Sequence, residues 1–392
     1  MPQPHAAATP QLLRRVNARS VLGIIRGTEV ATGTELMART GLSRASVIAV
    51  CEDLAGRGWI RELTARDEAS GGPRKGRPAR RFELNSSAGF VLGLDLGAAT
   101  TTAAVADLRG TVVGRSSERF RAADIPAAER IAVVDRACRQ ALAAAGTGPE
   151  TVLAVGAGIA APVDRDGKVL PAQPFWSLFD VGLRAALQDL HGWTVLLEND
   201  ANLAALGERW RGSGAGVDDL VVLLAGERLG AGVLESGRLL HGSRGAAGEM
   251  GYLELVQGVG STDGIASLAR QWSAADGGPT GGGEPGSRRV FQDAAAGDPA
   301  ALAILDRIAD RMARVIASVA SFINPEQVVI GGAVADSAGA LLPGITALLP
   351  RYTATPPRVT VSPLGDAIVT MGAIRHALDY VEANALELEL RK

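Results

Sequence analysis

The strongest constraint on the fold is a duplication in the body of the chain. A buried strand, a turn, a return strand and a second turn span residues 90–110, and the same order recurs across residues 220–242. The first turns, at Gly97 and Gly226, are 129 positions apart, and the second turns are 127 positions apart. Self-similarity of this kind predicts two related α/β halves. Two such halves leave a cleft between them, which is the usual place for a small ligand.

Length and composition place the chain among soluble globular proteins. Its 392 residues suffice for two or three domains, and 47% of them are hydrophobic while 21% are charged. The two cysteines, Cys51 and Cys138, lie too far apart to indicate a disulfide framework or a cysteine-ligated zinc site. No apolar run approaches the roughly 18 residues of a membrane span, and the first residues lack the basic and apolar regions of a secretory signal. We therefore expect a cytoplasmic protein with no membrane partner.

Charge is distributed unevenly along the chain. Residues 11–84 contain 14 Lys and Arg against eight Asp and Glu, a net charge of +6. Because the whole chain carries −2, the remainder carries −8. A basic head followed by an acidic body indicates that a nucleic-acid-binding domain precedes a domain of a different kind.

The basic head begins with the first two helices of a helix-turn-helix pattern. Apolar residues at helical spacing predict a helix over residues 12–26, whose buried stripe would contain Leu13, Val16, Val21 or Leu22, and Ile25. A short second helix fits residues 33–39. Gly41 then permits a tight turn, because glycine adopts positive φ without a steric penalty.

A third helix follows the turn and is expected to lie in the major groove of DNA. Ser43 is a natural N-cap for this helix. Arg44 and Ser46 lie at its N-terminal end, away from the buried stripe, and a guanidinium can bond guanine O6 and N7 together. The buried stripe comprises Val47, Val50 or Cys51, and Leu54.

Two short strands after the third helix predict the wing of a winged helix. They cover residues 59–63 and 80–84, and the segment between them is rich in Gly, Pro and basic residues. An Arg flanked by Gly and Pro, such as Arg77, is compact enough to enter a narrow minor groove. The alternative is a helical adaptor with a solvated charged loop. The DNA-binding residues expected from the helix and wing are Ser43, Arg44, Ser46, Arg74, Lys75 and Arg77.

Five short motifs follow one another through the body. They are Gly93-Leu94-Asp95-Leu96-Gly97, residues 158–164, Glu198-Asn199-Asp200-Ala201-Asn202, Gly248-Glu249-Met250-Gly251, and Asn324-Pro325-Glu326 with Gly331-Gly332. Their order and spacing resemble those of the ROK family of repressors, open reading frames and sugar kinases. The head, with residues 40–43 and 76–78, resembles that of ROK transcriptional regulators, whereas ROK kinases lack a head. The resemblance covers about residues 12–380.

The resemblance implies an actin-like body, a duplicated ribonuclease-H-like α/β fold with two lobes. We accordingly assign residues 11–85 to a winged helix-turn-helix DNA-binding domain and residues 88–392 to an effector-binding and oligomerisation domain. Its lobes would cover about residues 88–200 and 201–380. Because family members usually self-associate, and a helix-turn-helix protein gains by reading two half-sites, we expect a homodimer or homotetramer.

The resemblance also implies an effector site. In ROK kinases the Asp of the Glu-Asn-Asp motif takes the proton of the sugar hydroxyl that attacks ATP, and Asp200 occupies that position. A carboxylate there can act as a base or hydrogen-bond a sugar. Asn199 and Glu249 match sugar-contacting positions, and Gln173 and Tyr252 are further candidates. From the residues alone, Asn199 and Asp200 could instead form a strand-end turn in which Asp200 caps the next helix.

The parts that hold phosphate and zinc in the family are altered. Kinases have Asp-x-Gly-Gly-Thr in their first phosphate loop, where this chain has Asp95-Leu96-Gly97-Ala98-Ala99-Thr100. In the second loop the anionic Glu227 would oppose a triphosphate. Tyr252 replaces the histidine that precedes the zinc-binding cysteine cluster, and residues 256–265 contain no cysteine. Residues 264–266 stand where family members have a glutamate that touches the sugar, so this chain lacks that acid. We therefore expect no metal, no cofactor and no enzymatic activity, with Asp200 a vestigial base.

These observations predict a DNA-binding transcriptional regulator, a repressor of carbohydrate-related genes. Its partners would be double-stranded operator DNA and a sugar or sugar-derived effector bound in the body. Two alternatives remain. One is an ATP-dependent sugar kinase with a DNA-binding head, and the other is a constitutive DNA-binding protein whose body binds no ligand.

Overall fold

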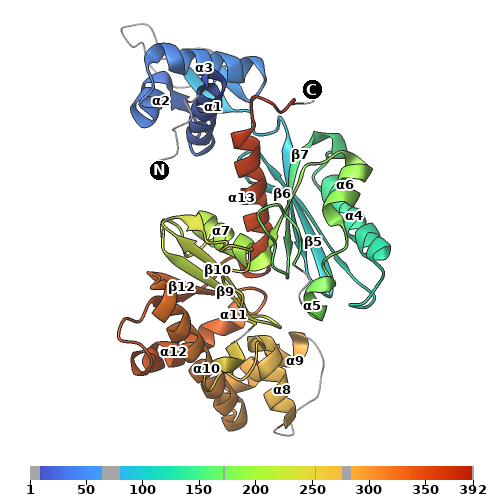
Figure 1. Ribbon diagram of the computed structural model, residues 1–392, viewed down its shortest axis with the longest axis vertical. Helices are drawn as coiled ribbons and strands as arrows, with labels where there is room; N and C mark the ends of the chain where they lie inside the picture. The colour runs from blue at the N-terminus through green and yellow to red at the C-terminus, as the bar shows by residue number, and fades with distance from the viewer. Residues whose placement is uncertain (1–8, 64–79, 171–172, 252, 276–283, 391–392) are drawn as a thin grey trace, which may run out of the picture.

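The computed structural model describes residues 9–63, 80–170, 173–251, 253–275 and 284–390. Figure 1 shows a small helical head at one end of an elongated body that is divided into two α/β lobes. Within the described residues, no helix is both long and apolar enough to cross a membrane. Cys51 and Cys138 are buried and unpaired.

The head combines three helices with a small antiparallel sheet. The helices are α1 (Pro10–Arg26), α2 (Gly33–Thr40) and α3 (Arg44–Gly56). The sheet has the order β1-β3-β2, with strands β1 (Ala31–Thr32), β2 (Ile60–Leu63) and β3 (Arg81–Leu84). The two wing strands pair as predicted. The two-residue strand β1, which pairs with β3, was not predicted.

Local signals set the helix boundaries in the head. Thr32 and Glu35 form a capping box at the start of α2. Gly41 ends α2 with φ of 70°, and the Ser43 hydroxyl caps α3 by accepting from the N–H of Ser46. The prediction for the buried stripe of α1 was wrong at Leu13 and Val16, which are each 51% exposed. The buried face of α1 comprises Ala18, Val21, Leu22 and Ile25, in the C-terminal half that packs on the rest of the head.

The body contains two five-stranded sheets with the same strand order, which confirms the predicted duplication. The first sheet has the order β6-β5-β4-β7-β8 and the second β11-β10-β9-β12-β13. In each sheet the central strand is antiparallel to its neighbour on one side and parallel to its neighbour on the other. The strands are β4 (Phe90–Leu96), β5 (Thr100–Asp107), β6 (Val112–Arg119), β7 (Val152–Ile159), β8 (Val195–Asn199), β9 (Leu220–Leu224), β10 (Gly230–Glu235), β11 (Arg238–Leu239), β12 (Gln327–Gly331) and β13 (Arg358–Val361).

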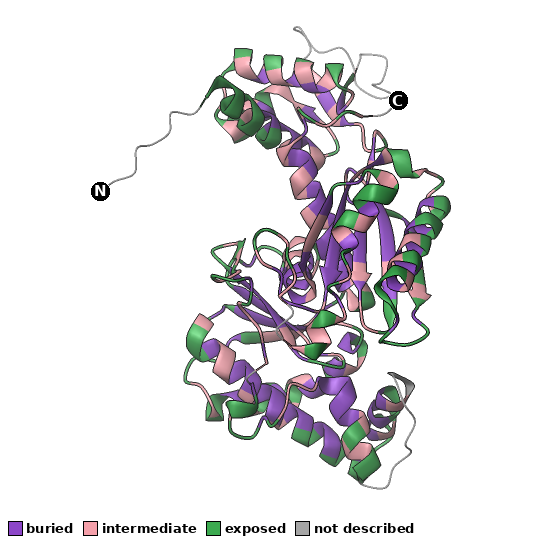
Figure 2. Ribbon diagram, turned by 45° about the vertical axis from the view of Figure 1, so that its right-hand side comes forward, coloured by how far each residue is buried: buried purple, intermediate pink, exposed green. Residues whose placement is uncertain are grey.

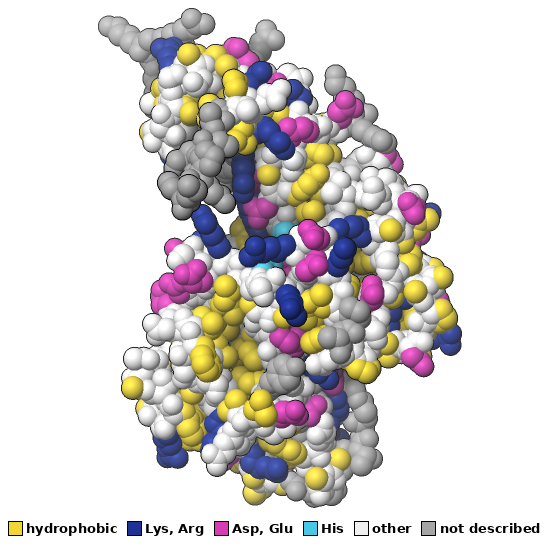
Figure 3. Space-filling view, viewed as in Figure 1, with side chains coloured by type: hydrophobic (Ala, Val, Ile, Leu, Met, Phe, Trp, Pro, Cys, Tyr) yellow, Lys and Arg dark blue, Asp and Glu magenta, His cyan; other side chains and the backbone are white. Residues whose placement is uncertain are grey.

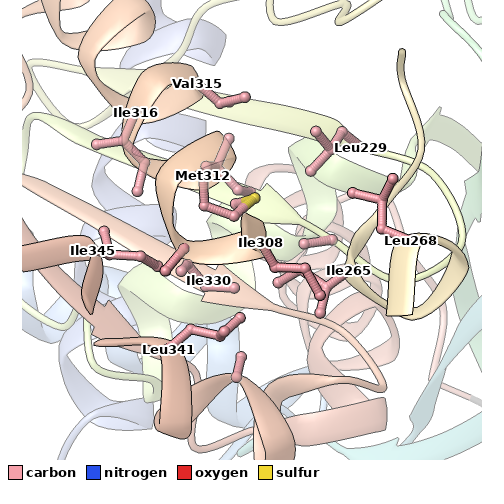
Figure 4. Packing of buried hydrophobic residues seen from close by; sticks show 14 of the residues in the cluster. Leu229, Ile265, Leu268, Ile308, Met312, Val315, Ile316, Ile330, Leu341 and Ile345 are labelled. Carbon is pink, nitrogen blue, oxygen red and sulfur yellow. The ribbon is translucent and has the colours of Figure 1, made fainter. Parts of the chain in front are cut away.

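Helices cover both sheets, and the strands between them are largely buried (Figure 2). In the second lobe, Ile308, Met312 and Ile316 of the long helix α10 pack toward Ile330 of β12 (Figure 4). The α-helices are α4 (Ala127–Ala144), α5 (Pro174–Ser177), α6 (Leu183–His191), α7 (Asp200–Arg211), α8 (Ile265–Ala275), α9 (Glu284–Ala295), α10 (Pro299–Ile323), α11 (Ala335–Ala338), α12 (Leu342–Leu348) and α13 (Ile368–Ala383). Short 3-10 helices occur at Pro149–Thr151, Leu253–Leu255, Gly339–Leu341, Leu349–Arg351 and Gly365–Ala367.

Helices α7 and α13 form the centre of the body. A Cβ atom on Gly372 of α13 would lie 1.7 Å from the carbonyl oxygen of Leu203 in α7. A Cβ on Gly207 of α7 would lie 2.7 Å from the carbonyl oxygen of Ile368. The two helices therefore approach so closely that only glycine fits at these contacts. Helix α13 also packs on β4 and β7 and continues toward the head (Figure 1).

Candidate effector and DNA-binding sites

The predicted effector residues Asn199 and Asp200 lie where β8 ends and α7 begins. Asn199 is the N-cap of α7, because its Oδ1 accepts from the N–H groups of Ala201 at 2.9 Å and Asn202 at 3.1 Å. Its Nδ2 donates to the carbonyl oxygen of Ala161 at 3.2 Å. The alternative in which Asp200 is the cap is therefore wrong. Asp200 is the first helical residue, and its Oδ1 accepts from the N–H of Ala201 at 2.8 Å.

Three acidic side chains interact at this junction. Burial, together with the charges of Asp95 and Glu249, raises the pKa of Asp200 to about 7, while the Ala201 N–H opposes the shift. Burial likewise raises the pKa of Asp95, at the end of β4, to about 6. Sequence reasoning quoted Asp95 in a motif but gave it no site role. The sequence feature that could have indicated a role is the position of Asp95, an acid within an otherwise apolar strand.

Glu249 reaches the junction from a loop of the second lobe. Burial raises the pKa of Glu249, and backbone N–H groups of Met250 and Gly251 oppose the shift. Gly248, with φ of 80°, holds this loop against β10, because a Cβ there would lie 2.1 Å from the carbonyl oxygen of Ala231. The structure thus brings Asp200, which follows β8, and Glu249, which follows β11, to one junction between the lobes.

A narrow crevice separates the two lobes at this point. Its volume is 20 Å³, and its lining includes Asn199 and Glu249. That volume holds about one water molecule. The Nε2 of Gln173, at the start of α5, lies 3.3 Å from the position of a Cβ on Gly251, beside the Glu249 loop. Tyr252 lies outside the described residues.

The second phosphate loop is closed by the start of α8. The N–H groups of Gly264, Ile265 and Ala266 donate to the carbonyl oxygens of residues 227, 225 and 226, at 2.8, 2.8 and 3.0 Å. In a phosphate site such N–H groups point at the ligand. The carboxylate of Glu227 is paired with Arg270 at the surface. These bonds occupy the carbonyl oxygens of the loop and the first N–H groups of α8.

The predicted DNA-binding helix presents its N-terminal end to solvent. Ser43 and Arg44 are exposed, and Arg44 makes no ion pair or hydrogen bond with the described residues. Ser46 is half-buried, and its Oγ lies 3.0 Å from the Oγ of Ser43. The predicted wing residues Arg74, Lys75 and Arg77 lie outside the described residues.

Arg80 fixes the base of the wing to α3, a role that sequence reasoning missed. Its Nη1 donates to Glu52 of α3 at 2.8 Å, and its Nε donates to Glu62 of β2 at 2.7 Å. Because both carboxylates occupy this guanidinium, Arg80 orients the wing rather than contacting DNA. The two acids lie 18 and 28 positions before Arg80, so only the fold brings them together.

The far end of α7 lies at the junction between head and body. Trp210 packs there against cations, with the Arg211 guanidinium 4.1 Å and the Arg26 guanidinium 5.9 Å from its ring centroid. Arg26 of α1 forms an ion pair with Glu382 of α13 at 2.5 Å, and both side chains are largely buried. Arg109 donates to backbone carbonyls of the head, including that of Thr28 at 2.7 Å.

No cluster of three or more His, Cys, Asp or Glu side chains suited to a metal ion occurs among the residues that the structure describes. The junction of β8 and α7 therefore offers hydrogen-bonding groups and carboxylates as its binding chemistry. Such groups recognise hydroxyl-rich ligands.

The chain is similar in sequence and in fold to known regulators and sugar kinases. The sequence pattern of the ROK family matches residues 91–379. The xylose repressor of Caldicellulosiruptor bescii is 23% identical over 346 residues, which cover 82% of this chain and 84% of that protein. A glucokinase of Halalkalibacterium halodurans is 32% identical over 190 residues, covering 42% of this chain and 56% of the kinase. The crystal structure of a ROK family transcriptional regulator, a homologue of the E. coli MLC protein, superimposes with a TM-score of 0.78 at 22% identity, covering 95% of this chain and 98% of that one.

Proposed function

Since the chain belongs to the ROK family, we propose that it is a transcriptional repressor whose DNA binding is controlled by a sugar or sugar-derived effector. One observation carries the proposal. Helix α7 begins at the candidate effector residues Asn199 and Asp200 and ends at Trp210, against Arg26 of the DNA-binding head. A single rigid element therefore connects the two sites.

The effector would bind between the lobes at the start of α7. The amide of Asn199 and the carboxylates of Asp200 and Glu249 offer acceptors for sugar hydroxyls, and Gln173 offers an amide beside them. Tyr252 is proposed as a further contact. Because the crevice is only 20 Å³, binding must change the separation of the lobes. The differential affinity for the two arrangements then supplies the free energy of the switch.

The change would reach the head through α7 and α13. These helices move as a pair, because Gly207 and Gly372 allow no gap between them. Trp210 and Glu382 at their far ends contact Arg26 of α1. A shift of the pair therefore tilts α1 and, in a dimer, changes the spacing of the two recognition helices. DNA affinity depends on that spacing.

DNA recognition would rest on α3 and the wing. Arg44 is exposed and uncommitted within the described residues, so it can donate to a guanine in the major groove. Ser43 and Ser46 lie beside it, and Arg74, Lys75 and Arg77 would contact the backbone and minor groove. A homodimer or homotetramer would place two heads on two half-sites.

A sugar kinase is the second candidate, since a carboxyl with the raised pKa of Asp200 suits a general base near neutral pH. The Glu227 carboxylate in the second loop weighs against it, because this negative charge would oppose a triphosphate at close range. Incubation of the purified protein with ATP and a panel of hexoses decides between the two. We expect no ADP, and steady ADP production with one hexose would replace the repressor by a kinase.

A thermal-shift screen tests the effector proposal. The panel contains monosaccharides, amino sugars, phosphosugars, short oligosaccharides and ATP. A ligand that binds only the native state stabilises it by about 2.7 kcal/mol at a hundred times its dissociation constant. We expect a shift with one sugar class, its loss in Asp200→Asn, and no shift with ATP. No shift with any sugar would favour the constitutive DNA-binding protein.

A further inference from the structure

A second and much larger cleft lies on the other side of β8. Its volume is 710 Å³, against 20 Å³ for the crevice at Glu249. Strand β8, helix α6, the turn at residues 164–167 and helix α13 contribute to its walls. Pockets of several hundred Å³ are typical of small-molecule sites. Figure 3 shows His side chains near the middle of the molecule with Lys and Arg side chains around them.

The acids with buried or half-buried side chains in this cleft are already satisfied by hydrogen bonds. Glu198 Oε1 accepts from the Asn199 N–H and from Asn202 Nδ2, at 2.8 and 2.9 Å, and Oε2 lies 2.8 Å from His241 Nε2. Asp164 Oδ1 accepts from the N–H groups two and four residues later, at 2.9 and 2.8 Å. The third acid, Asp166, is exposed at the rim.

The basic side chains, in contrast, have donors to spare. Arg184 of α6 gives one bond, from Nη1 to the carbonyl oxygen of Asp166 at 2.9 Å, and its Nε is buried with no partner in the described structure. Its guanidinium lies flat on Gly167, where a Cβ would come within 1.6 Å of Nη2. Burial lowers the pKa of His376 of α13, so its imidazole is neutral at neutral pH and offers one N–H, and it has no hydrogen bond to any described residue. Arg165 is exposed at the rim and likewise has no partner in the described structure.

The backbone of β8 adds further donors. β8 is the edge strand of its sheet, and the carbonyl of Thr194 accepts from Val155 of the neighbouring strand. Because peptide groups alternate along a parallel ladder, those of Val195 and Leu197 face the open edge. Both residues line the cleft. Each of these residues offers one N–H donor and one carbonyl acceptor, so the preference for an anion rests on the guanidinium groups of Arg184 and Arg165, whose free N–H groups favour negatively charged acceptor oxygens.

We propose that this cleft binds a small oxyanion, a carboxylate or a phosphate ester, through Arg184 and His376, with Arg165 at the rim. The site is separate from the sugar crevice and does not depend on the proposed function. His376 follows Arg375 in α13, and Arg375 lies 3.7 Å from the carboxylate of Glu382, the partner of Arg26 in the head. A bound anion therefore contacts the same helix that holds the DNA-binding head.

Calorimetric titration of the full chain with inorganic phosphate and with citrate, at constant ionic strength set by sodium chloride, tests the proposal. We expect saturable binding of at least one anion, and the two titrations show whether the site takes a phosphate or a carboxylate. Arg184→Gln and His376→Gln should each weaken binding by about tenfold or more. Arg139→Gln, which removes an exposed arginine of α4, is the matched control and should change nothing.

Histidine NMR of the natural protein gives a second, independent readout. The imidazole signal of His376, assigned by its absence in His376→Gln, should move during the titration and saturate with the calorimetric affinity. Anion binding that is unaffected by both variants would overturn the proposal. So would a response no larger than that to sodium chloride, or a His376 signal that stays fixed while an anion binds.

Discussion

At the scale of single residues, the proposed effector site depends on one carboxyl group, that of Asp200. Asp200 shares its surroundings with Asp95 and Glu249, so its charged form is disfavoured by burial and by two like charges. Its pKa of about 7 means that it is partly protonated at neutral pH. A ligand that donates a hydroxyl to Asp200 should therefore bind more tightly above pH 7 than below it.

Asp200→Asn should stabilise the protein at alkaline pH. The pKa of this carboxyl rises from 3.8 to about 7 on folding, so the native state binds the extra proton between those values. Stability is therefore lost as the pH rises through that window, and the loss is complete above pH 7. We expect the variant to gain about 1 to 3 kcal/mol at pH 8 and almost nothing at pH 4. Urea unfolding at both pH values measures the difference.

Asp189 provides the control for this experiment. Its carboxylate is exposed to solvent, so replacing it by Asn removes no cost of burying a charge. Asp189→Asn should show no gain that grows with pH. If Asp200→Asn is equally stable or less stable than the natural protein at pH 8, Asp200 is not a strained carboxylate.

Arg44→Gln should reduce sequence discrimination more than it reduces binding to any DNA. Loss of a bidentate contact to guanine costs about 1 to 3 kcal/mol of discrimination. A phosphate contact, in contrast, weakens binding to all sequences equally and lowers the salt dependence. Titration of operator and random duplexes at several salt concentrations separates the two. A uniform loss across sequences would assign Arg44 to the DNA backbone.

At the scale of helices and strands, the junction of α1, α7 and α13 couples head to body. Glu382→Gln removes the buried partner of Arg26. Breaking a fully charged buried ion pair costs about 3 to 5 kcal/mol. Burial raises the pKa of Glu382 to about 7, so the loss of stability at neutral pH should be smaller than that. The effector-dependent change in DNA affinity should shrink because α13 no longer holds α1. Effector affinity itself should stay within about twofold, since the change lies far from Asp200. Urea unfolding measures the stability. DNA titration over a range of effector concentrations measures both the change in DNA affinity and the affinity for the effector.

A matched pair lies on the same C-terminal segment. Glu387 pairs with Arg15 at 2.9 Å, but these side chains are 49% and 44% exposed. Glu387→Gln should therefore cost less than about 1 kcal/mol and leave the response to effector intact. An equal loss of response in both variants would show that any change in this segment disturbs the head.

The elements that could be predicted from the sequence are those with local signals. The turn at Gly41, the cap at Ser43 and the repeated strands of the two sheets each depend on residues close in the chain. Strand β1 could not be predicted, because two residues have no periodicity and its pairing with β3 joins positions 49 and 51 apart. The closure of the second phosphate loop by α8 joins residues 225–227 to residues 264–266, and no local pattern marks it.

In the candidate site the structure brings three of the predicted residues together, and their binding roles stay predictions. Asn199, Asp200 and Glu249 do approach one junction, but the cap is Asn199 and not Asp200. The influence of Asp95 on Asp200 and the donors of the 710 Å³ cleft arise from segments far apart in sequence. Such convergence depends on how the two lobes pack, which periodicity does not encode.

At the scale of the whole molecule, head and body share one apolar cluster. Trp59 and Ile25 of the head pack in the same cluster as Leu378 and Val381 of α13. The head thus packs directly on α13 of the body, and a movement of α13 must also move the residues of the head that contact it.

A dimer that seats two such heads should need two half-sites. We expect the affinity for a duplex with one half-site to fall toward that for non-specific DNA, which is typically about a thousandfold or more weaker than specific binding. Gel-shift titration of full and half operators, with mass measured by light scattering, tests this. Tight one-to-one binding of a monomer to a half-site would contradict it.

The most direct test of the account measures operator affinity with and without sugar. The operator is first selected from random duplexes, and fluorescence anisotropy at fixed salt then gives its affinity for the natural protein and for Asp200→Asn. We predict that the sugar found by thermal shift changes the affinity of the natural protein by about 5- to 150-fold, and that Asp200→Asn binds DNA without responding. Identical titration curves with and without a sugar that binds the protein would contradict the account.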